Sequence, residues 1–228
     1  MQTIYCISGL GADEGVFQYL DLSFVNPVFI QWIKPEKDET MKHYALRLKQ
    51  HYIHEEDPVI LGLSLGGMMA TEIAKMFPNA RVIIISSAKT KKEIPFYFKT
   101  FRYLPLYKTL PDWYMRQHSA LRVFFLGTKN ERSLNYIKHA AKHADGYFYR
   151  WAIGAILNWE NETVPMNVIH VHGTNDNLLP YRYVQSDITV NNGGHLMIID
   201  EAVEVSALIK GILENEDHTL KLAQLTAG

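Results

Sequence analysis

Short apolar runs alternate with amphipathic stretches along the chain, and this pattern constrains the fold more than any other feature of the sequence. The runs that we interpret as strands are residues 4–8, 27–33, 58–61, 81–86, 167–172 and 188–190. Apolar residues recur with helical spacing in residues 40–52, 65–77 and 196–213. Strands that alternate with helices are typical of a parallel sheet covered by helices. The predicted fold class is therefore α/β, with a minimal, mostly parallel sheet of about six strands.

The middle of the chain departs from this pattern. Residues 89–164 contain no clear strand, are rich in aromatic side chains and are interrupted by Pro95, Pro105 and Pro111. A chain of 228 residues fits one domain with a sizeable core. We therefore predict a core made of residues 1–88 and 165–228, with residues 89–164 inserted as a helical cap before the penultimate strand.

Charge is distributed unevenly. Residues 89–150 hold thirteen Lys and Arg against four Asp and Glu, whereas the remaining residues hold ten against twenty. Such a basic segment could attract an anionic substrate or an acidic membrane surface, although a solvated basic face without a partner is the simpler interpretation. Nothing in the sequence resembles a nucleic-acid-binding module.

The sequence indicates a cytoplasmic protein. No apolar run approaches the roughly 18 residues that a membrane span needs. The N-terminus lacks the basic and apolar regions of a signal peptide and begins like a strand. The single cysteine, Cys6, lies in an apolar run and excludes an intramolecular disulfide, so we expect a buried structural thiol.

Ser64 is the candidate nucleophile. It is the central residue of Gly62-Leu63-Ser64-Leu65-Gly66, which lies between a predicted buried strand and an amphipathic helix. Gly-x-Ser-x-Gly in this context favours a sharp turn that holds the serine in a strained conformation, with small residues letting strand and helix pass closely. The hydroxyl would then lie at a helix N-terminus, where the helix dipole stabilises developing negative charge. The alternative is a glycine-rich turn with an incidental serine.

A serine hydroxyl becomes a good nucleophile when a base takes its proton, and His195 is the candidate base. It follows Asn191-Asn192-Gly193-Gly194, between the last strand and the last helix, where two glycines let the loop bend back over the sheet edge. A histidine that caps a helix is the alternative. His170 and His172 share one face of a predicted strand, but no further ligand lies at a suitable spacing, so we expect no metal.

The base needs an acid that fixes its tautomer and stabilises the imidazolium. Asp176 comes directly after the strand 167–172, through Gly173-Thr174-Asn175, and is the candidate. A turn aspartate that bonds its own backbone is the alternative. Asp187 is the second choice for the acid, because it precedes a strand and would lie at the opposite edge of a parallel sheet.

This order of Ser64, Asp176 and His195 resembles the α/β-hydrolase superfamily, and the resemblance covers nearly the whole chain. It is similar to a small bacterial-type serine hydrolase with a helical cap that lacks the first two strands of the family. The resemblance implies that the backbone N–H groups of Leu10 and Leu65 form the oxyanion hole. The family usually has His-Gly at the turn after its first core strand, where this chain has Ser8-Gly9. No cofactor is implied.

The expected activity is hydrolysis of a small or medium ester or thioester through an acyl-enzyme. Amide hydrolysis, carbon–carbon bond hydrolysis and acyl transfer use the same three residues and stay open, because the pocket and the cap decide among them. A ligand-binding receptor with little or no turnover is the alternative outside the enzymes. A scaffold whose altered turn at Ser8 prevents catalysis is another. The expected partner is a small-molecule substrate, and the basic segment could favour an anionic one. The oligomeric state stays open.

Overall fold

The computed structural model describes residues 1–103, 128, 130–142 and 145–214. Within them, six strands form one parallel sheet in the order β2-β1-β3-β4-β5-β6, so the predicted α/β class and strand number are confirmed. The strands are β1 (Thr3–Ile7), β2 (Asn26–Ile30), β3 (Val59–Leu63), β4 (Arg81–Ile85), β5 (Val168–Gly173) and β6 (Ile188–Val190).

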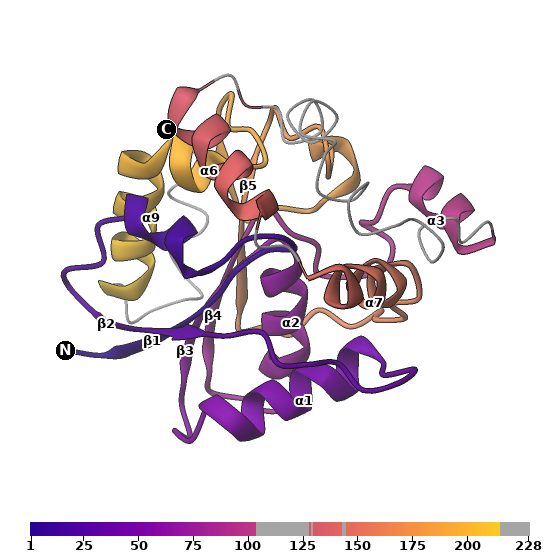
Figure 1. Ribbon diagram of the computed structural model, residues 1–228. Helices are drawn as coiled ribbons and strands as arrows, with labels where there is room; N and C mark the ends of the chain where they lie inside the picture. Colours follow the sequence, from indigo (N-terminus) through magenta and orange to yellow (C-terminus); the bar gives the residue numbers. More distant parts are fainter. Residues whose placement is uncertain (104–127, 129, 143–144, 215–228) are drawn as a thin grey trace.

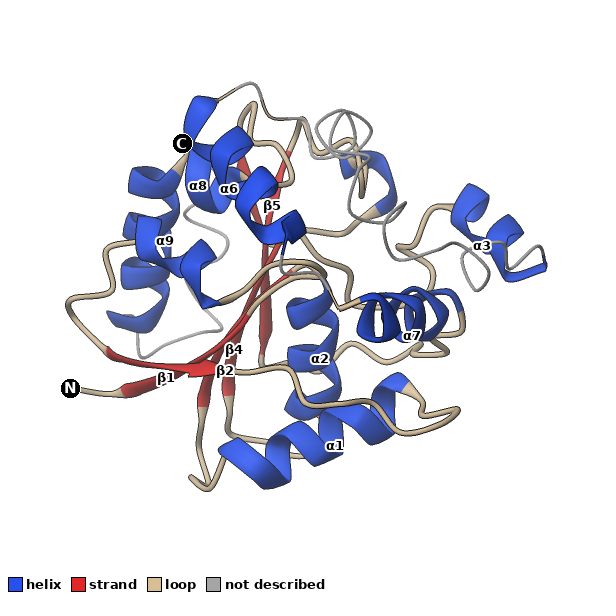
Figure 2. Ribbon diagram, in the orientation of Figure 1, coloured by secondary structure: helices blue, strands red, loops and turns tan. Residues whose placement is uncertain are grey.

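Helices cover both faces of this sheet (Figures 1 and 2). One face packs against α1 (Met41–Tyr52), α2 (Leu65–Ala74) and α7 (Gly146–Leu157). The other face packs against η1 (Glu14–Tyr19), α8 (Met197–Asp200) and α9 (Ala202–Glu214). Of the remaining described helices, α3 (Phe96–Tyr103) contacts α7, and α6 (Glu131–Lys142) contacts α8. The last of them is η3 (Tyr181–Tyr183). None of the described helices has the length and apolar character needed to cross a membrane.

Successive side chains of each strand point to opposite faces of the sheet, and this produces two core layers. In β1, Tyr5 and Ile7 pack with the layer of α1 and α2, whereas Ile4 and Cys6 pack with the layer of η1, α8 and α9. Both layers are apolar, which explains why the strands read as continuous apolar runs. Cys6 is a free, buried cysteine as expected, and burial raises the pKa of its thiol to about 12. The thiol is therefore an inert part of the core.

Three elements differ most from the sequence prediction. The strand predicted over 27–33 ends at Ile30, because it is an edge strand whose only neighbour, β1, ends opposite it at Ile7. The helix predicted over 65–77 ends at Ala74. The helix predicted over 196–213 is divided at Glu201 (φ −114°, ψ 34°) into α8 and α9. Met197, Ile198 and Ile199 of the short helix α8 are all buried.

The cap predicted over residues 89–164 falls partly outside the described residues. Its described parts contain α3, α6 and α7, whereas residues 104–127, 129 and 143–144 are not described. The division into core and cap therefore stays a prediction. Residues 215–228 also lie outside the described residues.

The junction of β3 and α2 brings backbones into direct contact. A Cβ atom at Gly66 would lie 2.1 Å from the Ile7 carbonyl oxygen of β1 and 2.4 Å from that of Ser8. At Gly62 it would lie 2.5 Å from the Gly66 carbonyl oxygen. Backbone atoms cannot move aside as a flexible side chain can, so only glycine fits at both ends of the Gly-x-Ser-x-Gly turn.

We expect Gly66→Ala to lower the free energy of unfolding by about 3 kcal/mol or more, because its methyl group would collide with two carbonyl oxygens of the neighbouring strand. Gly211→Ala is the matched control. A Cβ at Gly211, inside α9, meets no atom within 4 Å, so alanine should raise the stability by about 0.5–1 kcal/mol. Urea denaturation of both variants measures this. Equal effects of the two substitutions would contradict the steric explanation.

Candidate active site

Ser64 lies at the sharp turn between β3 and α2. Its backbone is in the left-handed region (φ 52°, ψ −117°), which a residue with a side chain rarely adopts. Hydrogen bonds hold this conformation: the Ser64 N–H donates to the Ile85 carbonyl of β4 at 2.9 Å, and the Ser64 carbonyl accepts from the Ser87 hydroxyl at 2.6 Å. The side chain makes no capping bond to α2. The turn therefore presents the hydroxyl of Ser64 to the loops above the sheet.

Two loops bring His195 and Asp176 to this hydroxyl. The loop after β5 and the loop after β6 touch through their backbones, since a Cβ at Gly173 would lie 2.1 Å from the Gly193 carbonyl oxygen. The same carbonyl accepts a hydrogen bond from the Asn175 N–H at 2.9 Å. Because β5 and β6 are parallel neighbours, both loops leave the sheet at the same edge.

The three sequence candidates form a continuous hydrogen-bonded row. His195 Nε2 lies 2.9 Å from Ser64 Oγ, and His195 Nδ1 lies 2.8 Å from Asp176 Oδ2. Both His195 and Asp176 are buried, with 3% of each residue exposed. The structure thus places Ser64, His195 and Asp176 together, as the sequence predicted. Asp187, the second choice for the acid, lies elsewhere: it accepts hydrogen bonds from the His170 N–H and from Lys89 Nζ.

Asp176 is held as a carboxylate despite its burial. Burial works to raise its pKa, but the neighbouring His195 and His172 and the Leu179 N–H together lower the pKa below its usual value. Its second oxygen, Oδ1, accepts from the N–H groups of Leu178 (2.9 Å) and Leu179 (2.8 Å). The carboxylate is therefore oriented on both oxygens, and Oδ2 is the one that faces the imidazole.

Behind Asp176 lies a buried pair of histidines whose importance the sequence did not reveal. His172 Nε2 lies 2.8 Å from the Leu179 carbonyl oxygen and 3.4 Å from Asp176 Oδ2, and His170 Nε2 lies 3.1 Å from His172 Nδ1. A carbonyl only accepts, so His172 carries its proton on Nε2. Burial lowers the pKa of both rings, and each is therefore neutral. His172 Nδ1 must then accept from His170 Nε2–H, which leaves His170 Nδ1 as a bare acceptor.

The structure agrees with this assignment of protons. His170 Nδ1 is a buried atom without a hydrogen-bond partner, which fits a bare acceptor. The pair clamps the Leu179 carbonyl while the Leu179 N–H holds Asp176, so the loop carrying the acid is fixed from both sides. Alternation along a strand put both histidines on one face, but only the fold shows that this face lies behind Asp176.

We expect the neutral His170 to make the protein less stable at acidic pH. Its folded-state pKa lies well below the ordinary value of 6.5, so between the two values the unfolded chain binds more protons. The free energy of unfolding is then highest above about pH 6.5. It falls as the pH drops, by up to about 1.4 kcal/mol per pH unit for one group. His170→Gln keeps an N–H for His172 and removes this titration, so it should flatten the pH dependence.

Urea denaturation at several pH values between about 5 and 7 measures this slope. His51→Gln, which replaces an exposed histidine of α1, is the matched control and should leave the slope as in the parent protein. An unchanged slope in His170→Gln would show that His170 is not the group responsible.

The turn after β1 lies against the serine. A Cβ at Gly9 would be 3.3 Å from the Ser64 Cβ, so the backbone around Leu10 passes directly beside the nucleophile candidate. Leu65 is the first residue of α2, where a backbone N–H has no acceptor within its helix. Ser8, which stands where the family usually has histidine, donates its hydroxyl to the Ala12 carbonyl at 3.0 Å. Ser8 therefore closes the turn on itself.

Ser64 and His195 open into a cavity of about 660 Å³. Its walls are almost entirely apolar, and none of the described residues that line it carries a charge. Helix α7 forms one wall with Tyr149, Ile153 and Ile156, which follow one another at helical spacing. The opposite face of α7 packs onto the core: the Trp151 and Tyr44 rings lie with centroids 4.2 Å apart and their planes tilted by 38°. Helix α7 is therefore both a wall of the cavity and an element that packs on the core.

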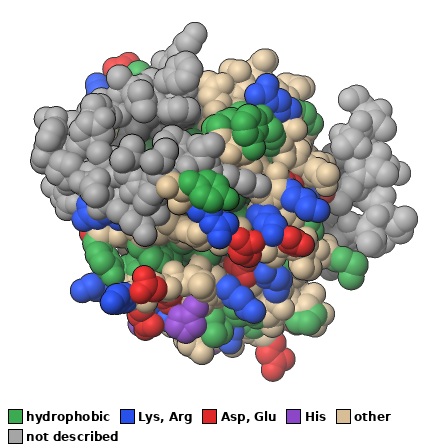
Figure 3. All heavy atoms as spheres, turned by 90° about the vertical axis from the view of Figure 1, so that its right-hand side faces the viewer, with side chains coloured by type: hydrophobic (Ala, Val, Ile, Leu, Met, Phe, Trp, Pro, Cys, Tyr) green, Lys and Arg blue, Asp and Glu red, His purple; other side chains and the backbone are tan. Residues whose placement is uncertain are grey.

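The basic segment is interleaved with acidic side chains where the structure describes it. Lys91 pairs with Glu160 (2.9 Å) and Glu162 (2.6 Å), and Arg102 pairs with Glu160 (3.1 Å). Figure 3 shows basic and acidic side chains side by side on the surface that carries α3 and α7. These cations lie on the outer surface, where they balance neighbouring carboxylates.

Among the described residues, one group of side chains could bring three metal-binding atoms together: Glu36, Glu39 and His43. Arg47 already pairs with both glutamates, at 3.4 Å from Glu36 and 2.8 Å from Glu39. The negative charge that would attract a cation is therefore balanced by this guanidinium. His170 and His172 bond to each other, as described above.

The sequence was then compared with known proteins. Residues 15–208 match the sequence model of the alpha/beta hydrolase family. The chain belongs to this family. The resemblance inferred from the order of Ser64, Asp176 and His195 is thus confirmed at the level of the family. Among curated proteins, no sequence relative was found.

Solved structures of alpha/beta hydrolases share the fold at low sequence identity. A malate-bound thermophilic esterase from Thermogutta terrifontis is 15% identical with a TM-score of 0.72, covering 93% of this chain and 89% of the esterase. A hydrolase from Pseudomonas aeruginosa is 11% identical with a TM-score of 0.75, covering 94% and 90%. A lipase-esterase related protein from Clostridium acetobutylicum is 17% identical with a TM-score of 0.67, covering 92% and 93%.

Proposed function

We propose that this alpha/beta hydrolase is a serine hydrolase that cleaves esters or thioesters with an apolar group through an acyl-enzyme. The observation that supports this best is the row from Ser64 Oγ through His195 to Asp176, with both hydrogen bonds between 2.8 and 2.9 Å, at the end of an apolar cavity. The esterases among the structural neighbours agree with this activity.

The reaction follows from the hydrogen bonds. His195 Nε2 takes the proton from Ser64 Oγ as the oxygen attacks the carbonyl carbon of the substrate. Asp176 accepts from His195 Nδ1–H and stabilises the imidazolium that forms. When the tetrahedral intermediate collapses, the carbon–oxygen or carbon–sulfur bond breaks and the leaving group takes the proton from Nε2. Water then attacks the acyl-enzyme by the same route and releases the acid.

The negative oxygen of the tetrahedral intermediate needs hydrogen-bond donors that face it. We assign this role to the backbone N–H groups of Leu10, in the turn beside Ser64, and of Leu65, at the N-terminus of α2. Removing one such donor typically costs about 3–4 kcal/mol of transition-state stabilisation. Because both donors belong to the backbone, serine in place of histidine at position 8 leaves them present.

The cavity restricts the class of substrate that fits the site. Its apolar walls favour an uncharged hydrocarbon group next to the reacting carbonyl, because a charged group would lose its hydration there without gaining a partner. The anionic substrate that the basic segment suggested could therefore carry its charge only on a part that stays outside this cavity. Water is kept from most of the site by the same walls, which strengthens the interactions around the intermediate.

Fluorophosphonate labelling tests the nucleophile. We expect the parent protein to be labelled and Ser64→Ala and His195→Ala not to be, because the first lacks the reacting oxygen and the second lacks its base. Ser64→Ala should also lose ester hydrolysis while keeping the parent's thermal stability. Hydrolysis that persists in Ser64→Ala would overturn the assignment. A folded parent protein that binds esters without turnover would instead favour a ligand receptor on this scaffold.

Replacing the acid tests the orientation of the base. In Asp176→Asn the amide oxygen can still accept from Leu178 and Leu179, but the amide nitrogen cannot accept from His195 Nδ1–H. We therefore expect kcat to fall by roughly 10⁴-fold with little change in folding. Asp187→Asn, at the other candidate acid, is the matched control and should change kcat only a few-fold. Comparable losses in the two variants would contradict the role of Asp176.

A further inference from the structure

A second cavity, of about 330 Å³, lies next to the active-site cavity. The two cavities share four lining residues, Gly11, Ala12, Ala140 and Tyr149, and three of these are glycine or alanine. Among the described lining residues, Tyr149 is thus the only one with a large side chain that both cavities share. Its ring therefore forms the wall between the two compartments.

The turn after β1 has room for this ring because residue 11 is glycine. Gly11 has a positive φ of 74°, and a Cβ built on it would lie 1.5 Å from the Tyr149 hydroxyl oxygen and 2.6 Å from Cζ. The phenol therefore rests directly on the backbone of the turn that includes Leu10. Tyr149 closes the active-site cavity at the point where the proposed oxyanion turn begins.

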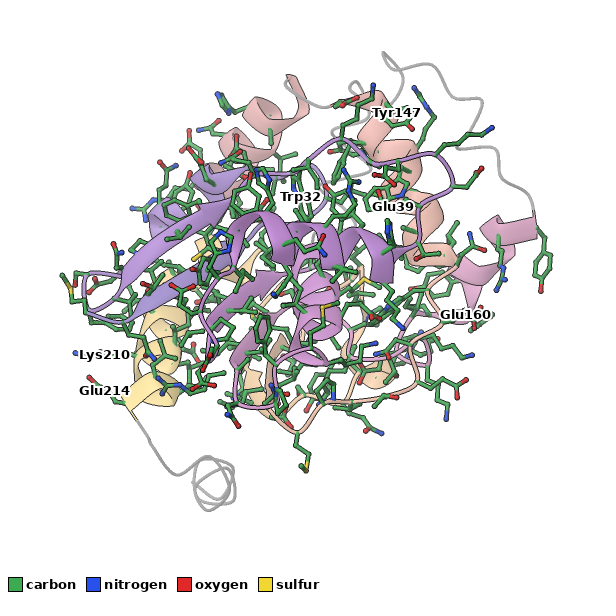
Figure 4. The ribbon with its side chains drawn as sticks, turned by 90° about the horizontal axis from the view of Figure 1, so that it is seen from below. Trp32, Glu39, Tyr147, Glu160, Lys210 and Glu214 are labelled. Atoms are coloured by element: carbon green, nitrogen blue, oxygen red, sulfur yellow. The ribbon has the colours of Figure 1, made fainter. Side chains whose placement is uncertain are left out.

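Helix α7 holds Tyr149 in this position. Asp145 caps its first turn by accepting from the Tyr147 N–H at 2.8 Å, and the Trp151 indole donates to the Glu39 carbonyl at 2.8 Å. The Tyr149 side chain itself is buried. Figure 4 shows Trp32 and Tyr147 on the same side of the molecule, away from Lys210 and Glu214 of α9. The wall is thus carried by a helix that is capped at its start and is held by Trp151 to the segment before α1.

The two compartments differ in chemistry. The active-site cavity has no charged side chain among its described lining residues, whereas the second cavity is lined by Asp13, Glu14, Lys34 and Asp145. A hydrocarbon chain is stabilised in the first compartment and also in the second, where Ile30, Trp32 and Phe148 lie beside the charged residues. A chain that ends in a hydroxyl group would in addition find polar partners in the second.

We propose that Tyr149 is a specificity-determining residue that limits the length of the apolar substrate group by separating these compartments. The inference rests on the proposed function, since it concerns the substrate of the same site. Removing the ring in Tyr149→Ala joins the polar compartment to the apolar one. The variant then accepts longer chains, and it prefers those with a terminal hydroxyl more than the parent protein does.

Binding can be measured without turnover in the Ser64→Ala background. Calorimetry with straight-chain primary alcohols gives the Kd at each chain length, and we expect affinity to stop rising once the chain reaches Tyr149. In Ser64→Ala/Tyr149→Ala the rise should continue, by up to roughly fourfold for each additional buried methylene. Beyond the length at which the parent background levels off, the double variant should also favour an α,ω-diol over the simple alcohol of equal length. An identical plateau in both backgrounds would overturn the proposal.

Two further variants distinguish the effect of removing the wall from the effect of a larger active-site cavity. Tyr149→Phe keeps the ring, so its chain-length profile should match the parent background. Ile153→Ala enlarges only the active-site cavity, so it should bind somewhat bulkier chains without gaining preference for the diol. A gain of diol preference in Ile153→Ala equal to that in Tyr149→Ala would overturn the proposal. Thermal denaturation establishes that each variant is folded.

The same variants with Ser64 intact connect the wall to catalysis. With p-nitrophenyl esters of increasing acyl length, kcat/KM for Tyr149→Ala relative to the parent should increase with length. A parent protein without Ser64-dependent hydrolysis would overturn the proposed function. The proposal about the wall would remain, because the binding experiment measures it without turnover. A parent that hydrolyses esters while Tyr149→Ala keeps the same length profile in hydrolysis and binding would overturn only the wall.

Discussion

The backbone contact between β1 and the start of α2 is the constraint on which the rest of the site depends. The Ile7 and Ser8 carbonyls lie where any side chain at Gly66 would be, so strand and helix pass as closely as two backbones can. This closeness forces the left-handed conformation of Ser64 and brings the turn around Leu10 beside it. Strain in the serine backbone is offset by the hydrogen bond that Ser64 donates to Ile85 of β4 and the one that it accepts from Ser87.

The parallel sheet then assembles the remaining groups at one edge. The turn after β1, the serine after β3 and the loops after β5 and β6 all leave the carboxyl ends of their strands. The contact of Gly173 with Gly193 sets the separation of the last two loops, and the histidine pair in β5 fixes the loop that carries Asp176. Each group is thus positioned by an element of the core rather than by a free loop, which keeps the hydrogen-bonded row in place.

Charge and apolar surface are separated between the outside and the inside of the region that covers the site. Lys91 and Arg102 of the basic segment pair with glutamates at the surface, while α7 turns only uncharged side chains toward the serine. A segment that reads as basic in the sequence therefore surrounds an apolar cavity. The amphipathic spacing of α7 produces this result, since one face meets the cavity and the other packs on α1 through Trp151 and Tyr44.

The sequence by itself determined the α/β class, the strands and the residues that meet at the site. Apolar runs, the Gly-x-Ser-x-Gly turn, and the positions of Asp176 and His195 after strands are local signals that need no knowledge of distant contacts. Only the tertiary structure decided where β2 ends, why α8 and α9 are separate, and what lies behind Asp176. Those outcomes depend on which segments become neighbours, such as the end of β1 beside β2 and the loop that covers His172. Spacing along the chain cannot reveal such neighbours, and for the same reason the wall formed by Tyr149 against Gly11 becomes visible only in the folded protein.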